Sequence, residues 1–353
     1  MAAIVGACAV RADISAPAAW VAGLFLVFIF GFSASAVPEE DGTTTVSSSR
    51  ITDFEIGSRD TRFGPLTFVG GLEMRSRDRR FGGLSSFRFL SPGDRFIGVT
   101  DTGFWFFGRL ERDGEGRPSG FTDFTMAPIH DPDGNIVDDK WTTDAEAIAV
   151  RGGEVAVGFE RVHRIAVFEF DPPDMGPAKL ELDFLVPEYE LRVNQGFETI
   201  AYAPEDSPLA GALVAITERS IDLQENIFAA ILSGPRKGIF TVVRSDEFDI
   251  TDGAFLPDGD LLLLERRFSL FNGGVAMRLR RIDGDDIKPG AAIDGTVLMQ
   301  ADMDYEVDNM EALDIWENAD GQTMISLLSD DNHSFLQRNL YLEFRLDDQA
   351  DTP

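Results

Sequence analysis

Acidic side chains recur at regular positions along this chain of 353 residues. In each of five segments, one residue opens an apolar stretch, a glycine turn follows, and an acidic residue ends the next apolar stretch. The opening residues are Ser85, Glu146, Glu198, Asp252 and Glu311, and the closing residues are Asp101, Glu160, Glu218, Glu265 and Asp330. Because two antiparallel strands about a tight turn place equidistant residues side by side, each pair is predicted to meet at the end away from its turn.

Nine of these ten positions carry a carboxylate, and carboxylates that converge need compensation. Two unit charges about 4 Å apart repel by about 4 kcal/mol at the effective dielectric of a protein surface. One solution is a hard cation such as Ca²⁺, which takes about six to eight oxygen ligands. The candidate metal ligands are Glu146, Glu160, Glu198, Glu218, Asp252, Glu265, Glu311, Asp330 and Asp331.

Arginine side chains offer a second way to compensate these charges. Arg161, Arg219 and Arg266 directly follow the closing acids of the second, third and fourth segments. They predict either structural ion pairs that fasten neighbouring segments or, together with Arg267, a site for an anionic ligand. A guanidinium suits phosphate because it can donate two parallel hydrogen bonds. Arginines that only face solvent at strand ends are the remaining interpretation.

Direct catalysis by one of the carboxylates is a further hypothesis. The candidates are Glu146, Glu198 and Glu311, which open their segments, and His333, which follows three polar residues at the end of the fifth segment. A histidine beside oxygen ligands can act as a general acid or bind a metal. The alternative for His333 is a loop histidine in contact with solvent.

The apolar residues inside the five segments alternate with a period of two, which predicts strands with one buried face. The opening residues are about 50 to 60 positions apart, and a repeat of this length is typical of a β-propeller with four strands per blade. We therefore predict an all-β fold, a single β-propeller with five blades, whose inner hairpins bring the acidic residues to one mouth of the central channel. A sixth blade built from residues 51–80 is the alternative.

The fifth segment has too few strands to complete a blade by itself. After its hairpin only one strand remains, at residues 339–346, whereas residues 65–74 form a strand with no hairpin partner. A propeller that closes with an N-terminal strand leaves no free edge. We therefore predict that residues 65–74 pair with residues 339–346.

The N-terminal residues 1–36 are predicted to be an export signal. Arg11 precedes an apolar run, and Ala34-Ser35-Ala36 provides the small-residue pattern of a cleavage site. The other predicted parts are a polar linker at residues 37–50, the propeller domain at residues 51–347 and a tail at residues 348–353. The mature protein is then periplasmic or secreted. The alternative is an uncleaved membrane anchor, with no membrane insertion beyond this segment.

Composition argues against several classes of partner and activity. The formal net charge is −30 at pH 7, and such a surface repels nucleic acid and anionic lipid. The only cysteine, Cys8, lies in the export segment, so no disulfide is predicted in the domain. No GxSxG, HExxH, GxxxxGK[ST] or GxGxxG motif is present, so serine-hydrolase, zincin and nucleotide-fold interpretations lack support. We expect a monomer.

Several motifs, in the same order, resemble the phytase-like domain family described as "esterase-like activity of phytase". They are GGLSSFRF at residues 82–89, VTDTG at 99–103, DAEAIAV at 144–150, NQGFETIAY at 194–202, NMEALDIW at 309–316 and LLSDDN at 327–332. The resemblance covers roughly residues 64–346. It implies an exported bacterial β-propeller that hydrolyses phosphoesters and, by similarity to β-propeller phytases, Ca²⁺ ions that bridge phosphates to acidic residues.

Two functions from different classes follow. The first is an exported hydrolase of a small anionic or ester substrate, such as a phosphoester, with a cation held at the acidic mouth. The second is a non-catalytic propeller that binds a ligand or a partner of the cell envelope. Dependence of stability and turnover on Ca²⁺ separates the two.

Overall fold

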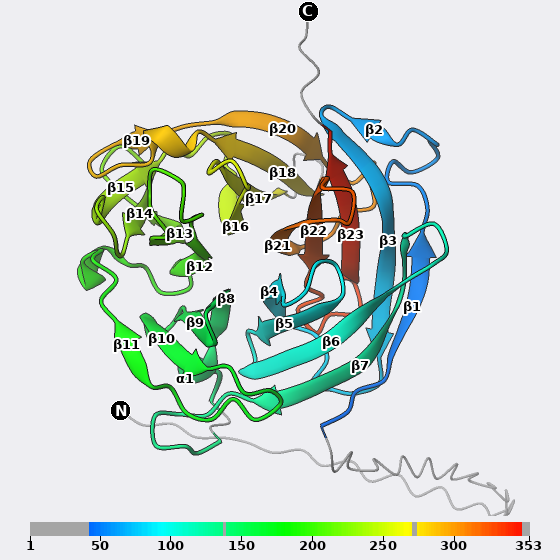
Figure 1. The fold of residues 1–353 in the computed structure, drawn as a ribbon, viewed down its shortest axis with the longest axis horizontal. Helices are drawn as coiled ribbons and strands as arrows, with labels where there is room; N and C mark the ends of the chain where they lie inside the picture. Colours follow the sequence, from blue (N-terminus) through cyan, green and yellow to red (C-terminus); the bar gives the residue numbers. More distant parts are fainter. Residues whose placement is uncertain (1–41, 137–138, 270–273, 348–353) are drawn as a thin grey trace, which may run out of the picture. The chain divides into compact units, whose positions relative to one another are not determined.

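The computed structural model describes residues 42–136, 139–269 and 274–347. These residues form five β-sheets arranged around one axis as the blades of a β-propeller (Figure 1). The predicted all-β class and the five blades are confirmed. Residues 51–80 do not build a sixth blade, because their strands belong to the fifth sheet. The predicted export signal at residues 1–36 lies outside the described residues.

The first four blades follow one another along the chain, and each begins at the axis and continues outward. Blade one contains β4 (Leu84–Phe89), β5 (Arg95–Thr100), β6 (Phe104–Arg112) and β7 (Pro118–Pro128). Blade two contains β8 (Ala145–Arg151), β9 (Glu154–Phe159), β10 (Arg164–Glu169) and β11 (Leu180–Leu182). Blade three contains β12 (Phe197–Tyr202), β13 (Leu213–Ile221), β14 (Ile227–Ile231) and β15 (Gly238–Val242). Blade four contains β16 (Asp249–Phe255), β17 (Leu261–Ser269), β18 (Gly274–Ile282) and β20 (Thr296–Ala301).

The strands within these blades pair antiparallel, as short turns between consecutive strands require. One addition departs from the pattern. The connection between β18 and β20 contributes β19 (Ala292–Ile293), which pairs parallel with the outer strand β15 of blade three. This addition covers an otherwise free sheet edge.

Blade five combines both ends of the described chain. It contains β21 (Met310–Glu317), β22 (Thr323–Ser329) and β23 (Asn339–Leu346), followed by β3 (Leu66–Ser76) and β1 (Val46–Ile51), while β2 (Arg62–Phe63) pairs with the start of β3. β23 and β3 pair antiparallel, from Asn339 opposite Met74 to Leu346 opposite Leu66. The predicted closure by an N-terminal strand is confirmed.

β1 lies in a segment predicted to be a linker. All six of its residues pair with β3, from Val46 opposite Ser76 to Ile51 opposite Gly71. The serine-rich composition concealed this strand, because an outer strand of a blade has little surface to bury and needs few apolar residues. The ordered chain therefore begins before residue 51.

The apolar core lies between the blades. The innermost strands β4, β8, β12, β16 and β21 contact one another in a closed ring, and five apolar clusters fill the spaces between neighbouring blades. Between blades one and two, Trp105 packs edge-on against Phe168 with ring centroids 5.0 Å apart. Burial of one such side chain stabilises the fold by about 1.5–3 kcal/mol. Because alternate residues of a strand face the same side of the sheet, apolar residues that pack between blades recur at every second position.

Helical structure in the described residues is short. It comprises α1 (Lys140–Thr143) and two 3₁₀ turns, η1 (Glu188–Glu190) and η2 (Gly284–Asp286). The Asp139 side chain caps α1 by accepting the N–H of Trp141 at 3.1 Å. Among the described residues, no helix has the length and apolar character needed to cross a membrane.

Candidate functional site

Each innermost strand carries a β-bulge near its start. The extra residues are Ser85, Glu146, Glu198, Thr251 and Glu311. The bulges all occur at the same end of their strands, and a bulge redirects a side chain out of the regular pleat. In blades one, two, three and five, the N–H of the closing residue donates to the carbonyl of the residue two positions before the bulge, as the Glu160 N–H does to the Asp144 carbonyl at 3.0 Å. Opening and closing side chains therefore gather around one mouth of the propeller.

The fourth blade differs from the predicted register by one residue. Its bulge falls on Thr251 and not on Asp252. Arg266, and not Glu265, is the partner of Asp249, which stands two positions before the bulge. A shift of one residue turns a strand side chain to the opposite face of the sheet. The structure therefore does not bring Asp252 and Glu265, which were predicted as metal ligands, into the carboxylate groups at the mouth.

Asp252 forms an ion pair inside the propeller. Arg88 of β4 donates to both of its carboxylate oxygens, at 2.8 and 2.9 Å, and to the carbonyl of Leu313 at 2.8 Å. Strands β4 and β16 are not neighbours in the ring, so this bidentate pair crosses the centre of the molecule. Asp252 is fully buried, and its charge is compensated without a metal.

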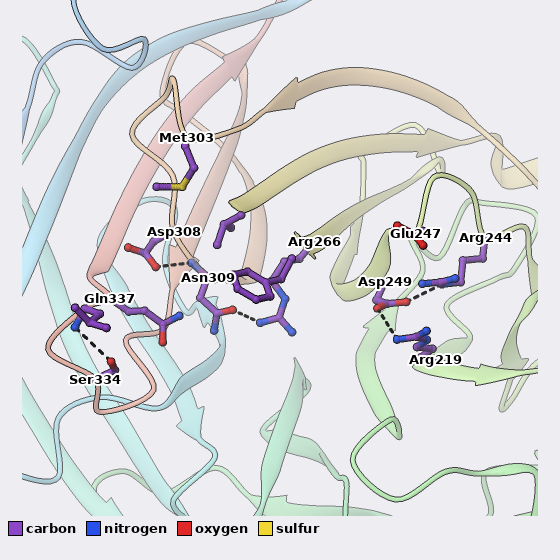
Figure 2. Close-up of a pocket in the computed structure, with 13 residues that line it drawn as sticks. Arg219, Arg244, Glu247, Asp249, Arg266, Met303, Asp308, Asn309, Ser334 and Gln337 are labelled. Atoms are coloured by element: carbon purple, nitrogen blue, oxygen red, sulfur yellow. Dashed lines mark hydrogen bonds and ion pairs between the residues drawn. The ribbon is translucent and has the colours of Figure 1, made fainter. Parts of the chain in front are cut away.

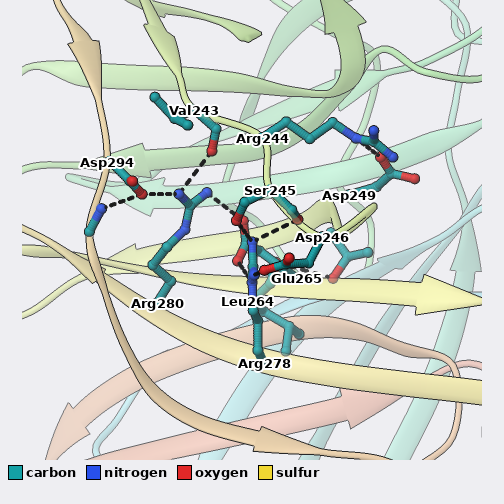
Figure 3. Close-up of polar contacts among 12 residues, drawn as sticks. Val243, Arg244, Ser245, Asp246, Asp249, Leu264, Glu265, Arg278, Arg280 and Asp294 are labelled. Carbon is teal, nitrogen blue, oxygen red and sulfur yellow. Dashed lines mark hydrogen bonds and ion pairs between the residues drawn. The ribbon is translucent and has the colours of Figure 1, made fainter. Parts of the chain in front are cut away.

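Glu265 is held between two arginines of β18 (Figure 3). Arg278 donates to one carboxylate oxygen and Arg280 to the other. All three side chains are buried, and Arg280 also donates to Asp294 at 2.7 Å. Both oxygens of Glu265 thus have charged partners, which is the arrangement a buried carboxylate requires. This cluster fastens β17 to β18 and to the chain that precedes β16.

Blades two and three bring five carboxylates together, and we call this group the acidic mouth. Its members are Asp144, Glu146, Glu160, Glu198 and Glu218. One oxygen each of Asp144, Glu146 and Glu160 lie within 4.8 Å of one another, and the same holds for Glu160, Glu198 and Glu218. Glu160 belongs to both groups. The structure thus brings Glu146 and Glu198 close together, with Glu160 and Glu218 beside them, as predicted.

The acidic mouth has few positive partners. Its ion pairs are Asp144 with Arg161 and with Lys140, the latter at 3.8 Å, and Glu218 with Arg266 at 3.4 Å. Within the described residues, no ion pair reaches Glu146, Glu160 or Glu198. Among the described backbone groups, only the N–H of Gly196 donates to the Glu160 carboxylate, at 3.2 Å. The charges of the mouth are thus only partly compensated.

Burial and mutual repulsion make these carboxylates hold protons. Burial raises the pKa of Glu160 to about 7, and the neighbouring Glu218 carboxylate adds to the shift. Burial also raises the pKa of Glu146 well above the usual range, and repulsion by the Asp144 carboxylate raises it further. Burial raises the pKa of Glu198 in the same way, with added repulsion from the Glu146 carboxylate. In the absence of a cation the group is therefore partly protonated near neutral pH.

Two buried carboxylate oxygens at this end of the propeller accept no hydrogen bond from a described residue. They are Oδ1 of Asp144 and Oδ1 of Asp101. Buried polar atoms are normally paired, so each such oxygen calls for an explanation. The acidic mouth offers only oxygen ligands, and Oδ1 of Asp144 accepts no hydrogen bond from a described residue. Oxygen ligands of this kind are what Ca²⁺ binds. The residues of the acidic mouth therefore fit a bound Ca²⁺ ion.

Blade five contributes Glu311 and Asp330, which lie outside the two carboxylate groups. Arg266 donates through one nitrogen to both Glu311 and Asn309. Burial raises the pKa of Glu311 to about 8 although Arg266 opposes the shift. Burial raises the pKa of Asp330 to about 6, and its Oδ1 accepts the N–H of Leu84 at 3.1 Å. Arg266, standing where the other blades have an acid, lies between Glu311 and Glu218.

The four arginines predicted to bind a ligand have different positions. Arg161 and Arg266 bind carboxylates of the mouth, and Arg219 pairs with Asp249 at 3.6 Å. Arg267 turns the other way and stacks on a phenylalanine ring at 4.8 Å. Because neighbouring strand residues face opposite sides, Arg266 and Arg267 do not form the joint phosphate site that their adjacency suggested.

His333 and Asp331 lie at the rim of blade five, beside two glycines of blade one. A Cβ atom at Gly82 would lie 2.7 Å from Oδ1 of Asp331 and 2.9 Å from Nδ1 of His333. A Cβ atom at Gly83, where φ is +64°, would lie 2.0 Å from Oδ1 of Asp101. The glycines of the GGLSS motif therefore permit this close approach. Neither His333 nor Asp331 belongs to the two carboxylate groups of the acidic mouth.

A cavity of about 820 Å³ opens beside the acidic mouth, between blades three, four and five (Figure 2). Its positive side chains are Arg219, Arg244 and Arg266. Asp249 accepts a hydrogen bond from Arg244 at 2.7 Å, and Asn309 lies on the opposite wall in contact with Arg266. Because Arg266 also contacts Glu218, one guanidinium connects the cavity with the mouth.

Asp144, Asp249 and Asn309 belong to the site without having been predicted for it. Each stands two positions before the bulge residue of its blade, where Gly83 and Gly196 stand in blades one and three. Alignment of the five segments on the position two residues before the bulge would have revealed Asp144, Asp249 and Asn309. The basic residues contributed by connections between blades have no repeated position, and only the fold reveals them.

Two solved structures are among those similar to this chain. The structure of the PQQ-bound form of an aldose sugar dehydrogenase from Streptomyces coelicolor is 12% identical, with a TM-score of 0.40, and the match covers 86% of this chain and 100% of that one. A luciferin-regenerating enzyme is 9% identical with a TM-score of 0.36, over 74% of this chain and 92% of that one. Such distant likenesses carry no argument about activity. No curated protein matches the chain.

The class is thus a five-bladed β-propeller with a ring of acidic and arginine side chains at one end. The model of the phytase-like family, described as "esterase-like activity of phytase", matches residues 79–333, which is more than two thirds of the chain. The protein belongs to this family, and the resemblance found in the sequence motifs is confirmed.

Proposed function

We propose that this protein is a hydrolase of small phosphoesters that uses Ca²⁺ held by the acidic mouth. The observation that carries the proposal is the crowding of Glu146, Glu160 and Glu198, which have no ion pair among the described residues. Burial of uncompensated carboxylates destabilises a fold, so a purely structural role does not account for them. A cation that binds only the folded protein recovers this cost. Membership of the phytase-like family supports the proposal.

Each residue has a defined part in this function. The donor sets are Asp144, Glu146 and Glu160 for one ion and Glu160, Glu198 and Glu218 for a second. Bound Ca²⁺ would supply positive charge toward phosphoryl oxygens and lower the pKa of a coordinated water. Arg266 orients the anionic group from the cavity side, and Glu311 beside it holds a proton near neutral pH. His333, at the rim, takes no part in this proposal.

The test is turnover of 4-nitrophenyl phosphate by the full-length protein, with and without Ca²⁺. We expect turnover only with Ca²⁺, and a loss of at least about tenfold in Glu198→Gln, since even indirect changes at metal sites have effects of this size. Glu181→Gln, on the exposed outer strand of the same blade as Glu160, is the matched control and keeps full activity. Ca²⁺ binding without turnover of this or any simple phosphoester would refute the hydrolase.

A non-catalytic, ligand-binding propeller is the second candidate, and Arg266 is the observation that favours it. Its contacts with Glu218 and Glu311 form an ion-pair network that stabilises the mouth without a metal. In this case Ca²⁺ leaves the melting temperature unchanged, no phosphoester is hydrolysed, and a small ligand or an envelope partner occupies the mouth. The melting temperature and the turnover, each measured with and without Ca²⁺, therefore decide between the two candidates.

We also propose that the protein is exported and acts in the periplasm or outside the cell. The support is the apolar run of residues 1–36 with its Ala34-Ser35-Ala36 site, which lies outside the described residues. N-terminal sequencing of the exported protein is expected to begin at Val37. A mature chain that begins at Met1 would instead support a membrane anchor.

A further inference from the structure

One wall of the cavity beside the acidic mouth carries arginine N–H groups with no hydrogen-bond acceptor among the described residues. Arg219 is half-exposed, and its one ion pair among the described residues is the 3.6 Å contact with Asp249. Arg244 donates to the same carboxylate through Nε at 2.7 Å. Two guanidinium groups thus share the Asp249 carboxylate (Figure 2), and these contacts use only Nε of Arg244 and one nitrogen of Arg219. Their other N–H groups have no hydrogen-bond acceptor among the described residues of this lining. This is the requirement for binding a phosphate or similar anion.

Another part of the cavity lining is apolar and exposed. The side chains are Phe268, Met303 and Leu336, which are 65%, 53% and 78% exposed. Figure 2 shows Met303 across the cavity from Arg244. Single exposed apolar residues need no explanation, but three that line one cavity beside a set of arginines mark a surface that a ligand covers.

The remaining charges of the lining limit the ligand to one anionic end. Glu247 and Asp308 also line the cavity, on opposite sides of it in Figure 2. A ligand that carries phosphates all around its ring would direct some of them at these carboxylates and at the apolar side chains. A ligand with one anionic group and an apolar remainder presents only that group to the charged lining, where Arg219 and Arg244 offset the nearby Glu247.

We propose that this cavity selects phosphomonoesters whose alcohol is apolar, either aryl or alkyl, over polyphosphorylated and small polar ones. The inference rests on the proposed function, because it names the substrate class of the same site. Arg219 and Arg244 bind the phosphate on the side of the acidic mouth. Phe268, Met303 and Leu336 cover the apolar group of the alcohol.

The test measures binding of non-hydrolysable probes to the full-length protein by titration calorimetry in CaCl₂. Phenylphosphonate is expected to bind about tenfold more tightly than methylphosphonate. Tenfold corresponds to about 1.4 kcal/mol, which the burial of about 55 Å² of apolar surface supplies at about 25 cal/mol per Å². Inositol hexakisphosphate is expected to bind more weakly than phenylphosphonate. Equal affinities of the two phosphonates, or tighter binding of the hexakisphosphate, would overturn the inference.

Variants separate the two walls of the cavity. Leu336→Ser is expected to reduce the preference for phenylphosphonate to about threefold or less, because exposure of part of the aryl group removes part of that burial. Affinity for methylphosphonate stays unchanged. Arg219→Gln is expected to weaken both phosphonates about equally. Leu223→Ser, which alters a 97% exposed leucine outside the cavity, is the control and changes neither affinity. An unchanged preference in Leu336→Ser would contradict the apolar wall.

These measurements distinguish failure of the inference from failure of the proposed function. The probes contain no hydrolysable bond, so the binding preference is measured whether or not the protein is an enzyme. If 4-nitrophenyl phosphate is turned over but the two phosphonates bind equally, the inference is wrong and the hydrolase stands. If the preference is present but no phosphoester is turned over, the cavity is a ligand site and the hydrolase is wrong.

Discussion

Buried carboxylates have different partners in blade four than in blades two and three. In blade four, Glu265 is bound by Arg278 and Arg280, and Asp252 is bound by Arg88. In blades two and three, Glu146, Glu160 and Glu198 lie close together without an ion pair to any described residue. Arginines therefore neutralise the buried acids of blade four, whereas Glu146, Glu160 and Glu198 at the mouth have no arginine partner among the described residues.

The difference between these regions arises from one position of register. In blade four the bulge lies on Thr251, one residue before Asp252, which is the acid that corresponds to Glu146 and Glu198 in the sequence repeat. Thr251 therefore occupies the position at the mouth, and the Asp252 side chain turns toward the centre of the propeller. Acids of the same repeat consequently have either a structural role or a ligand-binding role. The comparison predicts that their removal has opposite effects on stability.

The largest effect is expected from removal of the fully paired acid. Glu265→Gln leaves Arg278 and Arg280 buried without a counter-charge, which costs about 3–5 kcal/mol. Urea unfolding at pH 7 measures this loss, and Ca²⁺ is not expected to reverse it. A loss below about 1 kcal/mol would show that Glu265 does not fasten β17 to β18 and would remove one side of the comparison.

The next effect concerns pH. Glu160 has a pKa of about 7 in the folded protein, against about 4.3 in an unfolded chain. Between these values the folded state keeps protons that the unfolded state releases, so the free energy of unfolding falls as pH rises. Glu160 alone accounts for roughly 3 kcal/mol between pH 4.5 and pH 8.

Added Ca²⁺ is expected to oppose this loss of stability at high pH. The cation competes with the bound protons, so its stabilising effect is expected to be small at pH 4.5 and large at pH 8. Thermal unfolding across this range, with EDTA or with excess CaCl₂, measures both curves. Curves that remain parallel at every pH would show that the carboxylates of the mouth do not bind the ion.

Removal of an unpaired acid is expected to stabilise the protein in EDTA. Glu198→Gln takes away one buried carboxylate that has no ion pair, and we expect a gain of about 1–3 kcal/mol at pH 8, the usual cost of an unsatisfied buried group. Stabilisation by Ca²⁺ is lost in the same variant. If Glu198→Gln destabilises the protein in EDTA, the carboxylate has a structural role and the two regions do not differ.

The smallest effects test the position of neighbouring arginines. Arg266→Gln removes the one cation that contacts both Glu218 and Glu311 and is expected to cost about 1–2 kcal/mol in EDTA. Arg267→Gln, one residue on, faces away from the mouth and is expected to cost less than about 1 kcal/mol. Equal costs in urea unfolding would mean that the register of blade four is not the one described.

Much of the fold could be predicted from the sequence because its signals are local. The period of two predicts strands, the repeat of about 50 to 60 residues predicts blades, and the unpaired strand at residues 65–74 predicts the closure of blade five. β1 could not be predicted, because a strand at the outside of a blade is held by backbone hydrogen bonds rather than by apolar side chains.

The site was predicted less completely, for two physical reasons. Bulges decide which acids reach the mouth, and a bulge changes the backbone without changing the composition, so the shift between Asp252 and Thr251 was invisible in the pattern. The partners of the acids, such as Arg88 and Arg280, come from strands of other blades or of the same sheet at distant sequence positions. Only the fold brings these partners together.

The central claim is that the acidic mouth of blades two and three binds a divalent cation. Titration calorimetry of the full-length protein with CaCl₂ at pH 7.5 tests it most directly, with Glu198→Gln and the exposed control Glu181→Gln measured beside it. The account predicts saturable binding in the unmodified protein and in Glu181→Gln, and a loss of affinity of at least about tenfold in Glu198→Gln. Folded protein that shows no saturable binding of Ca²⁺, or equal affinity in all three proteins, would contradict it.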